Sequence, residues 1–365
     1  MLAPARSAAA LGLRAHRSRP TTTTHATTHA TKPATPPPTP WDSRWDRGYA
    51  ARANDDTVAS AVDALFAREH SSGFIAATPS TPISVGDAVE IQLVPQRKSY
   101  AHGAGCSCPF CQPVDTRQRA VQWRGWQVLA NAFPYAPHHL VIASASHAPQ
   151  SIDRRIVLDM IDLQRALGPT TTLHYNGIAG NSQPHRHWQG TRERLPLTRL
   201  LDADALALAV VRRDSDAEVR SFDDGFFAGL LVTGTPAGVA RNAARLADAL
   251  ERDEQTRGCY NMLLLPMRDN QVRLVVIPRN ADHIAVDAGV LGTVRLGAFD
   301  LAGRGVLARE SVSADGVAAF LDAAARSVVR PQHLAWLSSF GRAPSSDAVS
   351  LRLWQAPAGA SPGDG

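Results

Sequence analysis

Two histidines and a glutamine alternate along one short segment of the sequence, at His185, His187 and Gln189. Successive side chains of a β-strand point to opposite faces, so a strand here would present all three from one face. A neutral imidazole can attack phosphorus and hold the transferred group as a phosphoramidate, which divides one transfer into two steps. An amide in third place can donate to a phosphoryl oxygen without protonating a leaving group, which favours transfer over hydrolysis. The segment predicts phosphoryl chemistry, and a metal site or a buried polar patch is the alternative.

A glycine-containing turn lies directly before this segment, at residues 177–181, and is followed by Ser182. Backbone N–H groups in such a turn, together with short polar side chains such as that of Asn181, can bind an anion. The turn therefore adds a possible phosphate-contacting loop to the histidine segment.

Three of the four cysteines are close together, at Cys106, Cys108 and Cys111. Four cysteines in 365 residues do not make a secreted disulfide framework, so the cluster indicates a metal or reactive site in a reducing compartment. The motif Cys108-Pro109-Phe110-Cys111 can supply two thiolates to zinc, although such pairs are also redox-active or simply buried.

The elements that must position these residues form a mixed α+β unit on an antiparallel sheet. Apolar periodicity and the punctuation by Gly and Pro predict one helix between residues 41 and 77, and then strand, strand, helix, strand, glycine loop and strand. A second stretch repeats the order of a helix followed by two strands, so we expect a structural duplication. The predicted elements are strands at Val89–Val94, Val128–Ala130, His139–Ser144, Leu173–Asn176, His185–Gln189, Tyr260–Leu265 and Val272–Pro278, and helices at Ile152–Leu167 and Val239–Arg252.

Composition and charge exclude several classes of protein. The chain is 44% hydrophobic, and we find no apolar run of the roughly 18 residues needed to cross a bilayer, which argues against an integral membrane protein. The net charge is +5, but the segment before Asp42 holds four Arg, one Lys and no acid, so the remainder is neutral and a nucleic-acid-binding surface is not indicated. Residues 1–41 are a Thr/Pro/Ala-rich tract that we expect to be disordered. The chain is expected to be cytoplasmic, and an organellar location follows instead if this tract is a transit peptide.

The run GNSQPHRHWQ, together with NAFPYAPHHLVIAS upstream, resembles the transferase branch of the histidine triad superfamily over about residues 89–310. This branch contains galactose-1-phosphate uridylyltransferases, diadenosine tetraphosphate phosphorylases and GDP-hexose phosphorylases. The resemblance implies a duplicated histidine-triad (HIT-like) α+β fold, with antiparallel sheets and packed helices. Its expected parts are an N-terminal half at 42–215, a C-terminal half at 216–345 and a flexible tail at 346–365.

The resemblance also implies roles for individual residues. His187 matches the nucleophile that becomes nucleotidylated, Gln189 matches the residue that holds the phosphoryl oxygens, and His185 completes the catalytic segment. The residues that it assigns to substrate or phosphate binding are Asn176, Gly180, Asn181, Ser182, Lys98 and Asn131.

A structural zinc site follows from the same resemblance, because the uridylyltransferases pair a CxxC motif with two histidines. Cys108, Cys111, His147 and His185 would then form a closed Cys₂His₂ site. Two alternatives stay open: Cys106 could replace Cys108, and His138 or His139 could replace His147.

The activity implied is nucleotidyl transfer or phosphorolysis, and SQPHRHWQ and YNMLLL most resemble the enzymes that transfer adenylyl between a dinucleoside polyphosphate and phosphate. The alternatives are a hexose-1-phosphate uridylyltransferase, a GDP-hexose phosphorylase, a nucleotide hydrolase or a non-catalytic nucleotide-binding module. The expected partners are a nucleotide substrate and a phosphate or sugar-phosphate acceptor, with no organic cofactor, no nucleic acid and no membrane, in a monomer or homodimer.

Other conspicuous residues receive structural interpretations. We expect Trp123 and Trp126 to pack in the core rather than stack on a base, and Cys259 to be buried beside an apolar strand. Arg279 is expected to form a surface salt bridge rather than to reach a phosphate.

Overall fold

The computed structural model describes residues 50–75, 81–86, 88–96, 108–111, 117–178, 180 and 183–340. They belong to one compact unit, Pro40–Gly365. The expectations for the segments 1–41 and 346–365 lie outside the described residues. In the described ranges, every helix is too short or too polar to span a bilayer.

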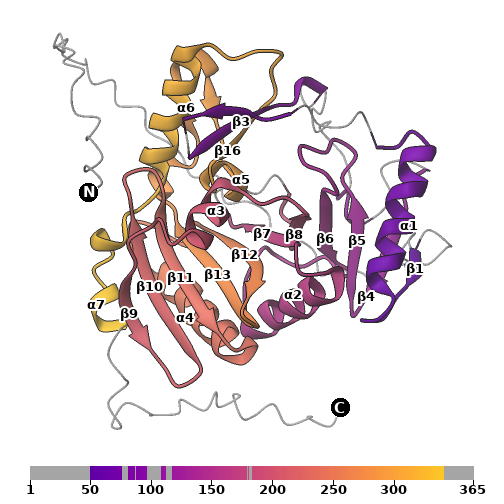
Figure 1. Cartoon of the computed structure of the whole chain (residues 1–365), viewed down its shortest axis with the longest axis horizontal. Helices are drawn as coiled ribbons and strands as arrows, with labels where there is room; N and C mark the ends of the chain where they lie inside the picture. Colours follow the sequence, from indigo (N-terminus) through magenta and orange to yellow (C-terminus); the bar gives the residue numbers. More distant parts are fainter. Residues whose placement is uncertain are drawn as a thin grey trace, which may run out of the picture. The chain divides into compact units, whose positions relative to one another are not determined.

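An eleven-stranded sheet runs through the described residues in the order β1-β4-β5-β6-β8-β7-β12-β13-β11-β10-β9 (Figure 1). All of its neighbouring strands are antiparallel except β1 and β4, which are parallel. The strands are β1 (Ala50–Arg52), β4 (Ala120–Trp123), β5 (Trp126–Ala130), β6 (Leu140–Ser144), β7 (Thr172–Asn176), β8 (His187–Thr191), β9 (Ala209–Arg213), β10 (Ala217–Asp223), β11 (Ala228–Gly234), β12 (Tyr260–Arg268) and β13 (Gln271–Pro278).

The strand order confirms the expected duplication. In the first half, β4, β5 and β6 form a meander, helix α2 (Arg154–Leu167) follows, and β8 returns to pair with β6. In the second half, β9, β10 and β11 form the meander, helix α4 (Pro236–Arg252) follows, and β13 returns to pair with β11. The halves join where β7 pairs with β12, which places Asn176 opposite Asn261.

Helices α1 (Val58–Ser71), α2 and α4 contribute their apolar faces to one large core that also contains alternate residues of the sheet, among them Trp188 of β8. Helix α2 begins where the carboxylate of Asp153 accepts from the Ile156 N–H. Helix α4 begins with Thr235 as its N-cap and Pro236 in its first turn. Helix α4 therefore begins three residues before the start predicted from the sequence periodicity.

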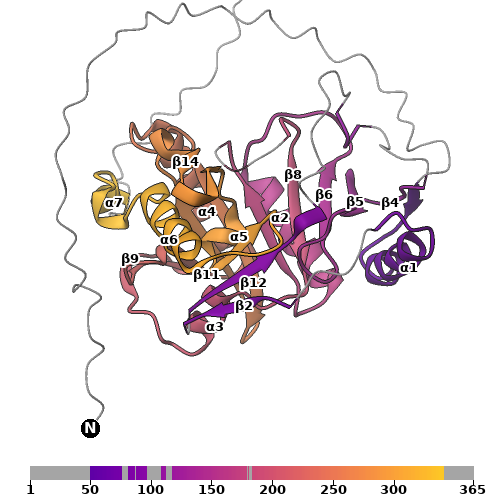
Figure 2. The same ribbon diagram turned by 90° about the horizontal axis from the view of Figure 1, so that it is seen from above.

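A second core lies on the other face of the sheet, where a small sheet in the order β16-β3-β2 packs with further helices (Figure 2). Strand β3 was predicted correctly, but it pairs in parallel with β16 and is not part of the main sheet. The elements here are β2 (Ile83–Val85), β3 (Val89–Leu93), β16 (Arg304–Leu307), α3 (Pro196–Asp202), α5 (Ala298–Leu301) and α6 (Ala314–Ser327). The remaining short elements are β14 (Val286–Asp287), β15 (Thr293–Val294), α7 (Leu337–Phe340) and 3-10 turns at Ala281–His283, Gly289–Leu291 and Pro331–His333.

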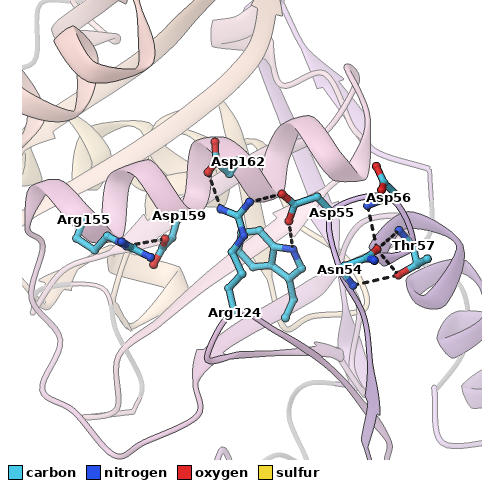
Figure 3. A network of polar contacts seen from close by, with 9 residues as sticks. Asn54, Asp55, Asp56, Thr57, Arg124, Arg155, Asp159 and Asp162 are labelled. Atoms are coloured by element: carbon cyan, nitrogen blue, oxygen red, sulfur yellow. Dashed lines mark hydrogen bonds and ion pairs between the residues drawn. The ribbon is translucent and has the colours of Figure 1, made fainter.

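The turn between β4 and β5 is tied to helix α2 and to the residues just before helix α1 by a polar network (Figure 3). Arg124, at the turn, forms ion pairs with Asp55 and Asp162. The buried indole N–H groups of Trp123 and Trp126 donate to Asp55 and Asp159, respectively. The prediction that both tryptophans pack in the core is therefore confirmed.

Candidate active site and metal cluster

The side chains of His187 and Gln189 lie on the face of β8 opposite Trp188, which is buried in the core formed with α1, α2 and α4. This is the alternation that the sequence predicts. Strand β8 begins at His187, so the predicted strand start at His185 is two residues too early. The ring of His185 belongs instead to the cysteine cluster described below.

The tautomer of His187 is set by its own backbone neighbour. Its Nδ1 lies 2.7 Å from the carbonyl oxygen of His185, which can only accept, so Nδ1 carries the hydrogen and Nε2 carries the lone pair. Burial lowers the pKa of His187 to about 4, against a smaller raising effect of this hydrogen bond. The ring is 3% exposed. The imidazole is therefore neutral at pH 7, with Nε2 available as a nucleophile.

Gln150 fixes the backbone around His187. Its Nε2 donates to the carbonyl oxygens of Asn176 (2.9 Å) and His187 (3.0 Å), and its Oε1 accepts from the His187 N–H (2.9 Å). These contacts join the end of β7 to the start of β8. Our reading of the sequence missed Gln150, because it lies in the loop before α2, where neither periodicity nor a motif distinguishes it.

The carboxamide of Gln189 is held by two residues of the upstream motif NAFPYAPHH. Its Oε1 lies 2.8 Å from His139 Nε2 and accepts from the Tyr135 hydroxyl at 3.1 Å. Asn131, expected to bind substrate, lies beside this group with its Nδ2 3.5 Å from His139 Nε2, while its Oδ1 accepts from the Phe133 N–H at 2.9 Å. Residues of this motif therefore bind the Gln189 carboxamide and lie around it.

The turn after β7 packs closely against the second half. Asn176 Oδ1 accepts from Asn261 Nδ2 (2.9 Å) and from the Ala298 N–H (2.8 Å). A Cβ atom at Gly180 would lie 3.1 Å from the Leu296 carbonyl oxygen and 3.2 Å from Asn261 Nδ2, so glycine permits this close approach. Of the other expected phosphate contacts, Lys98, Asn181 and Ser182 lie outside the described residues.

Arg279 departs from expectation, because it is fully buried and the predicted surface salt bridge is wrong. Its Nη1 donates to Asn261 Oδ1 and to the Leu296 carbonyl oxygen, both at 2.7 Å, and its Nε donates to the Ser327 carbonyl oxygen at 3.1 Å. Burial lowers its pKa to about 10. Arg279 binds the groups against which Gly180 packs.

The four expected metal ligands Cys108, Cys111, His147 and His185 come together, with their ligand atoms within 4.8 Å of one another. Cys108 Sγ lies 3.2 Å from His185 Nδ1, and Cys111 Sγ lies 3.2 Å from His147 Nδ1 and 3.3 Å from His185 Nδ1.

The two alternatives left open for this site have different outcomes. His139 lies against Gln189 and His138 packs against Phe66, so neither replaces His147 in the cluster. Cys106 lies outside the described residues, and its alternative role is not addressed by the structure.

The donor set fits zinc. Tetrahedral Zn–S and Zn–N bonds place neighbouring S and N ligand atoms about 3.5 Å apart, close to the separations observed here. His185 Nε2 lies 2.8 Å from the Ser144 carbonyl oxygen, which leaves the Nδ1 lone pair facing both sulfurs, as in metal sites whose histidines are oriented by a backbone acceptor. A hydrogen bond from the Cys111 thiol lowers the pKa of Cys108, although burial opposes the change. One thiolate is thereby already favoured.

Phe110, inside the CxxC motif, contacts both His185 of the cluster and His187. Its ring centroid is 4.8 Å from that of His187 and 5.6 Å from that of His185. The CxxC segment of the four-ligand cluster therefore packs directly against His187.

Comparison with known proteins relates this geometry to other structures. A family model described as a domain of unknown function (DUF4922) matches residues 52–192. The search of curated proteins gives no match.

Solved structures of yeast Ap4A phosphorylase Apa2 are similar to this chain. The complex with Ap4A is 14% identical, with a TM-score of 0.53, over 73% of this chain and 94% of that one. The complex with AMP is 14% identical, with a TM-score of 0.53, over 75% and 95%. A further structure of Apa2 is 13% identical, with a TM-score of 0.51, over 70% of this chain and 88% of that one. The chain therefore has the α+β fold that its resemblance to the histidine triad transferases implied.

Proposed function

We propose that this chain is a nucleotidyltransferase or phosphorylase that works through a covalent nucleotidyl–His187 intermediate. The observation that carries the proposal is the hydrogen bond from His187 Nδ1 to the His185 carbonyl oxygen, which leaves the Nε2 lone pair of a buried, neutral imidazole free to attack. Gln189 on the same face of β8 supplies an amide and no acid. This pair is suited to forming a phosphoramidate and keeping it from hydrolysis.

The preferred reaction is adenylyl transfer between a dinucleoside polyphosphate and phosphate. His187 Nε2 bonds to the α-phosphorus, while the bond from that phosphorus to the bridging oxygen breaks. With diadenosine tetraphosphate the leaving group is ATP. An oxygen of inorganic phosphate then attacks the same phosphorus, the P–N bond breaks, and ADP leaves with His187 regenerated. The fold shared with yeast Ap4A phosphorylase supports this choice of substrate.

A uridylyltransferase is the second candidate, and the Cys₂His₂ cluster favours it. The uridylyltransferases that the sequence resembles carry such a site, and Cys108, Cys111, His147 and His185 fit zinc in this chain. A GDP-hexose phosphorylase is a third possibility. All three candidates share the intermediate and differ in the base that the pocket accepts.

Zinc in this cluster would have a structural role. With four protein ligands it has no open coordination position and supplies crosslinking instead of Lewis-acid chemistry. It would join the CxxC segment, the loop after β6 and the residue two positions before His187. The cluster would therefore hold the His185 carbonyl oxygen, which sets the His187 tautomer, in place.

Intact-protein mass spectrometry tests the proposal. Purified protein is incubated separately with diadenosine tetraphosphate, UDP-glucose and GDP-glucose, without acceptor, beside the His187→Ala variant. We expect a mass gain of one AMP with diadenosine tetraphosphate that is absent in the variant. A UMP or GMP adduct would assign the chain to one of the alternatives, and near-normal turnover by His187→Ala would exclude the covalent route.

A further inference from the structure

The two ends of the Gln189 carboxamide have different surroundings. Oε1 has His139 Nε2 at 2.8 Å and the Tyr135 hydroxyl at 3.1 Å, which can occupy both of its lone pairs. The described residues give no hydrogen bond to Nε2, and His174 is a further neighbour that interacts with this carboxamide. The oxygen end is therefore engaged by the protein, and the nitrogen end is available for a ligand.

With the carboxamide oxygen facing His139 and Tyr135, the hydrogens of the shorter contacts run in one direction, while Asn131 Nδ2 lies farther away, at 3.5 Å from His139 Nε2. The oxygen of the carboxamide can only accept, so His139 Nε2 and the Tyr135 hydroxyl are both donors. The Tyr135 hydroxyl also lies 3.2 Å from His174 Nε2, and because its own hydrogen goes to Gln189, His174 must be the donor of that contact. Burial lowers the pKa of His174 to about 3, so its ring is neutral, and donation to the Tyr135 hydroxyl places its one hydrogen at Nε2. The hydrogen bond from His139, and the chain that runs from His174 through Tyr135, both end on Gln189 Oε1.

The opposite orientation of the carboxamide requires the other histidine tautomers. A flipped Gln189 donates to His139 Nε2 and to the Tyr135 hydroxyl only if His139 carries its hydrogen on Nδ1 and Tyr135 donates to His174, so a His139 hydrogen on Nδ1 would refute the orientation described here. The donors themselves are fixed by packing, since the Tyr135 ring centroid lies 4.0 Å from that of His139 and 4.9 Å from that of Phe299. Tyr135 and His139 are both buried.

We propose that Tyr135 and His139 are positioning residues that hold the Gln189 carboxamide with its N–H groups toward the phosphoryl oxygens of the substrate. This inference rests on the proposed function, because it assigns these N–H groups to the charge that develops during attack by His187. Neither residue needs to touch the substrate. Their contribution is preorganisation: the donors of Gln189 are already aimed when the transition state forms.

The experiment measures the single-turnover rate of AMP–protein formation from diadenosine tetraphosphate in Tyr135→Phe and His139→Leu. Each change removes one hydrogen bond to Oε1, and we expect the rate to fall roughly threefold to tenfold, with affinity for AMP little changed. His139→Gln, which restores an N–H donor, should be faster than His139→Leu. Matched controls are Tyr175→Phe, which removes a buried hydroxyl on the other face of β7, and His138→Leu, next to His139 in sequence. Both controls should keep the wild-type rate.

A double-mutant cycle shows whether the two residues act through Gln189. Gln189→Ala should slow adduct formation by itself, and adding Tyr135→Phe to it should have no further effect. If Tyr135→Phe instead slows the Gln189→Ala variant as much as it slows the wild type, the inference is overturned. Equal slowing in the controls would also overturn it.

A ligand-free measurement separates this inference from the proposed function. If the wild type forms no adduct with any nucleotide, the proposed function fails, but the hydrogen bonds can still be examined by ¹⁵N NMR of histidine-labelled protein. We expect His139 in the Nε2–H tautomer, with its Nε2 resonance shifted by Gln189→Ala and not by His187→Ala. A His139 resonance that is indifferent to Gln189→Ala would refute the positioning role.

Discussion

Replacing Gln150 by alanine should separate the positioning of His187 from the general stability of the protein. Gln150 makes three hydrogen bonds of 2.9–3.0 Å to the backbone of Asn176 and His187, and Gln150→Ala removes all of them. At about 1 kcal/mol for each bond, the free energy of unfolding should fall by about 3 kcal/mol. For a protein of this size that corresponds to a fall of about 6 °C in the melting temperature.

Gln164→Ala is a matched control. Gln164 is also a glutamine whose Nε2 lies 2.8–3.1 Å from three backbone carbonyl oxygens, those of Thr171, Leu264 and Leu265. It lies on α2, in the core on the other face of the sheet from His187 and Gln189. The two substitutions should therefore cost similar stability, while only Gln150→Ala releases the backbone of His187.

The assay compares melting temperatures with the single-turnover rate of adduct formation at saturating diadenosine tetraphosphate, below the melting transition of both variants. Displacing the nucleophile by a fraction of an ångström should slow Gln150→Ala on the order of 10- to 100-fold, whereas Gln164→Ala keeps the wild-type rate. Equal rates in the two folded variants would show that the Gln150 contacts do not position His187, and the reasoning would fail.

Two other predictions concern pH and metal. Because the pKa of His187 is lowered to about 4, a pH–rate profile of adduct formation should be nearly constant between pH 8 and pH 5.5. The rate should fall only as the ring is protonated near pH 4. An imidazole that titrates near its ordinary value of about 6.5 would instead lose about tenfold in rate by pH 5.5. Cys111→Ser should release zinc, as measured by elemental analysis. It should also lower the melting temperature more than Cys259→Ser does, since Cys259 is buried outside the cluster. Wild-type protein that contains no zinc after purification without chelators would contradict this prediction.

Local patterns in the sequence predicted the elements that carry the site. The run around His187 alternates with period two, and Pro184 and the glycine turn mark its start, so β7 and β8 were found to within a few residues. What the patterns could not supply was the set of contacts between distant segments. The ion pair of Glu90 with Arg304 joins β3 to a strand more than 200 residues away, and this pairing has no local signature.

Local sequence patterns also failed to predict the positions of two residues of the site. Arg279 follows an apolar strand and was expected at the surface, but it is buried, because the amide of Asn261 and the carbonyl oxygens of Leu296 and Ser327 surround it. Gln150 sits in a loop with no pattern, and its role appears only when β7 and β8 are placed side by side. The sequence singled out His187 and Gln189 as candidate site residues, but not the residues that hold them.

The pairing of β7 with β12 has a consequence for how such a chain can arise and be divided. A cut between the two halves would leave β7 and β12 as bare edges, each exposing a row of unpaired backbone groups that invites aggregation or self-pairing. A single half could cover this edge by pairing with a copy of itself, and fusing two copies makes the cover permanent. Fusion also lets the copies diverge: β13, the counterpart of β8, contains no histidine, so the two halves carry different side chains at these equivalent strands.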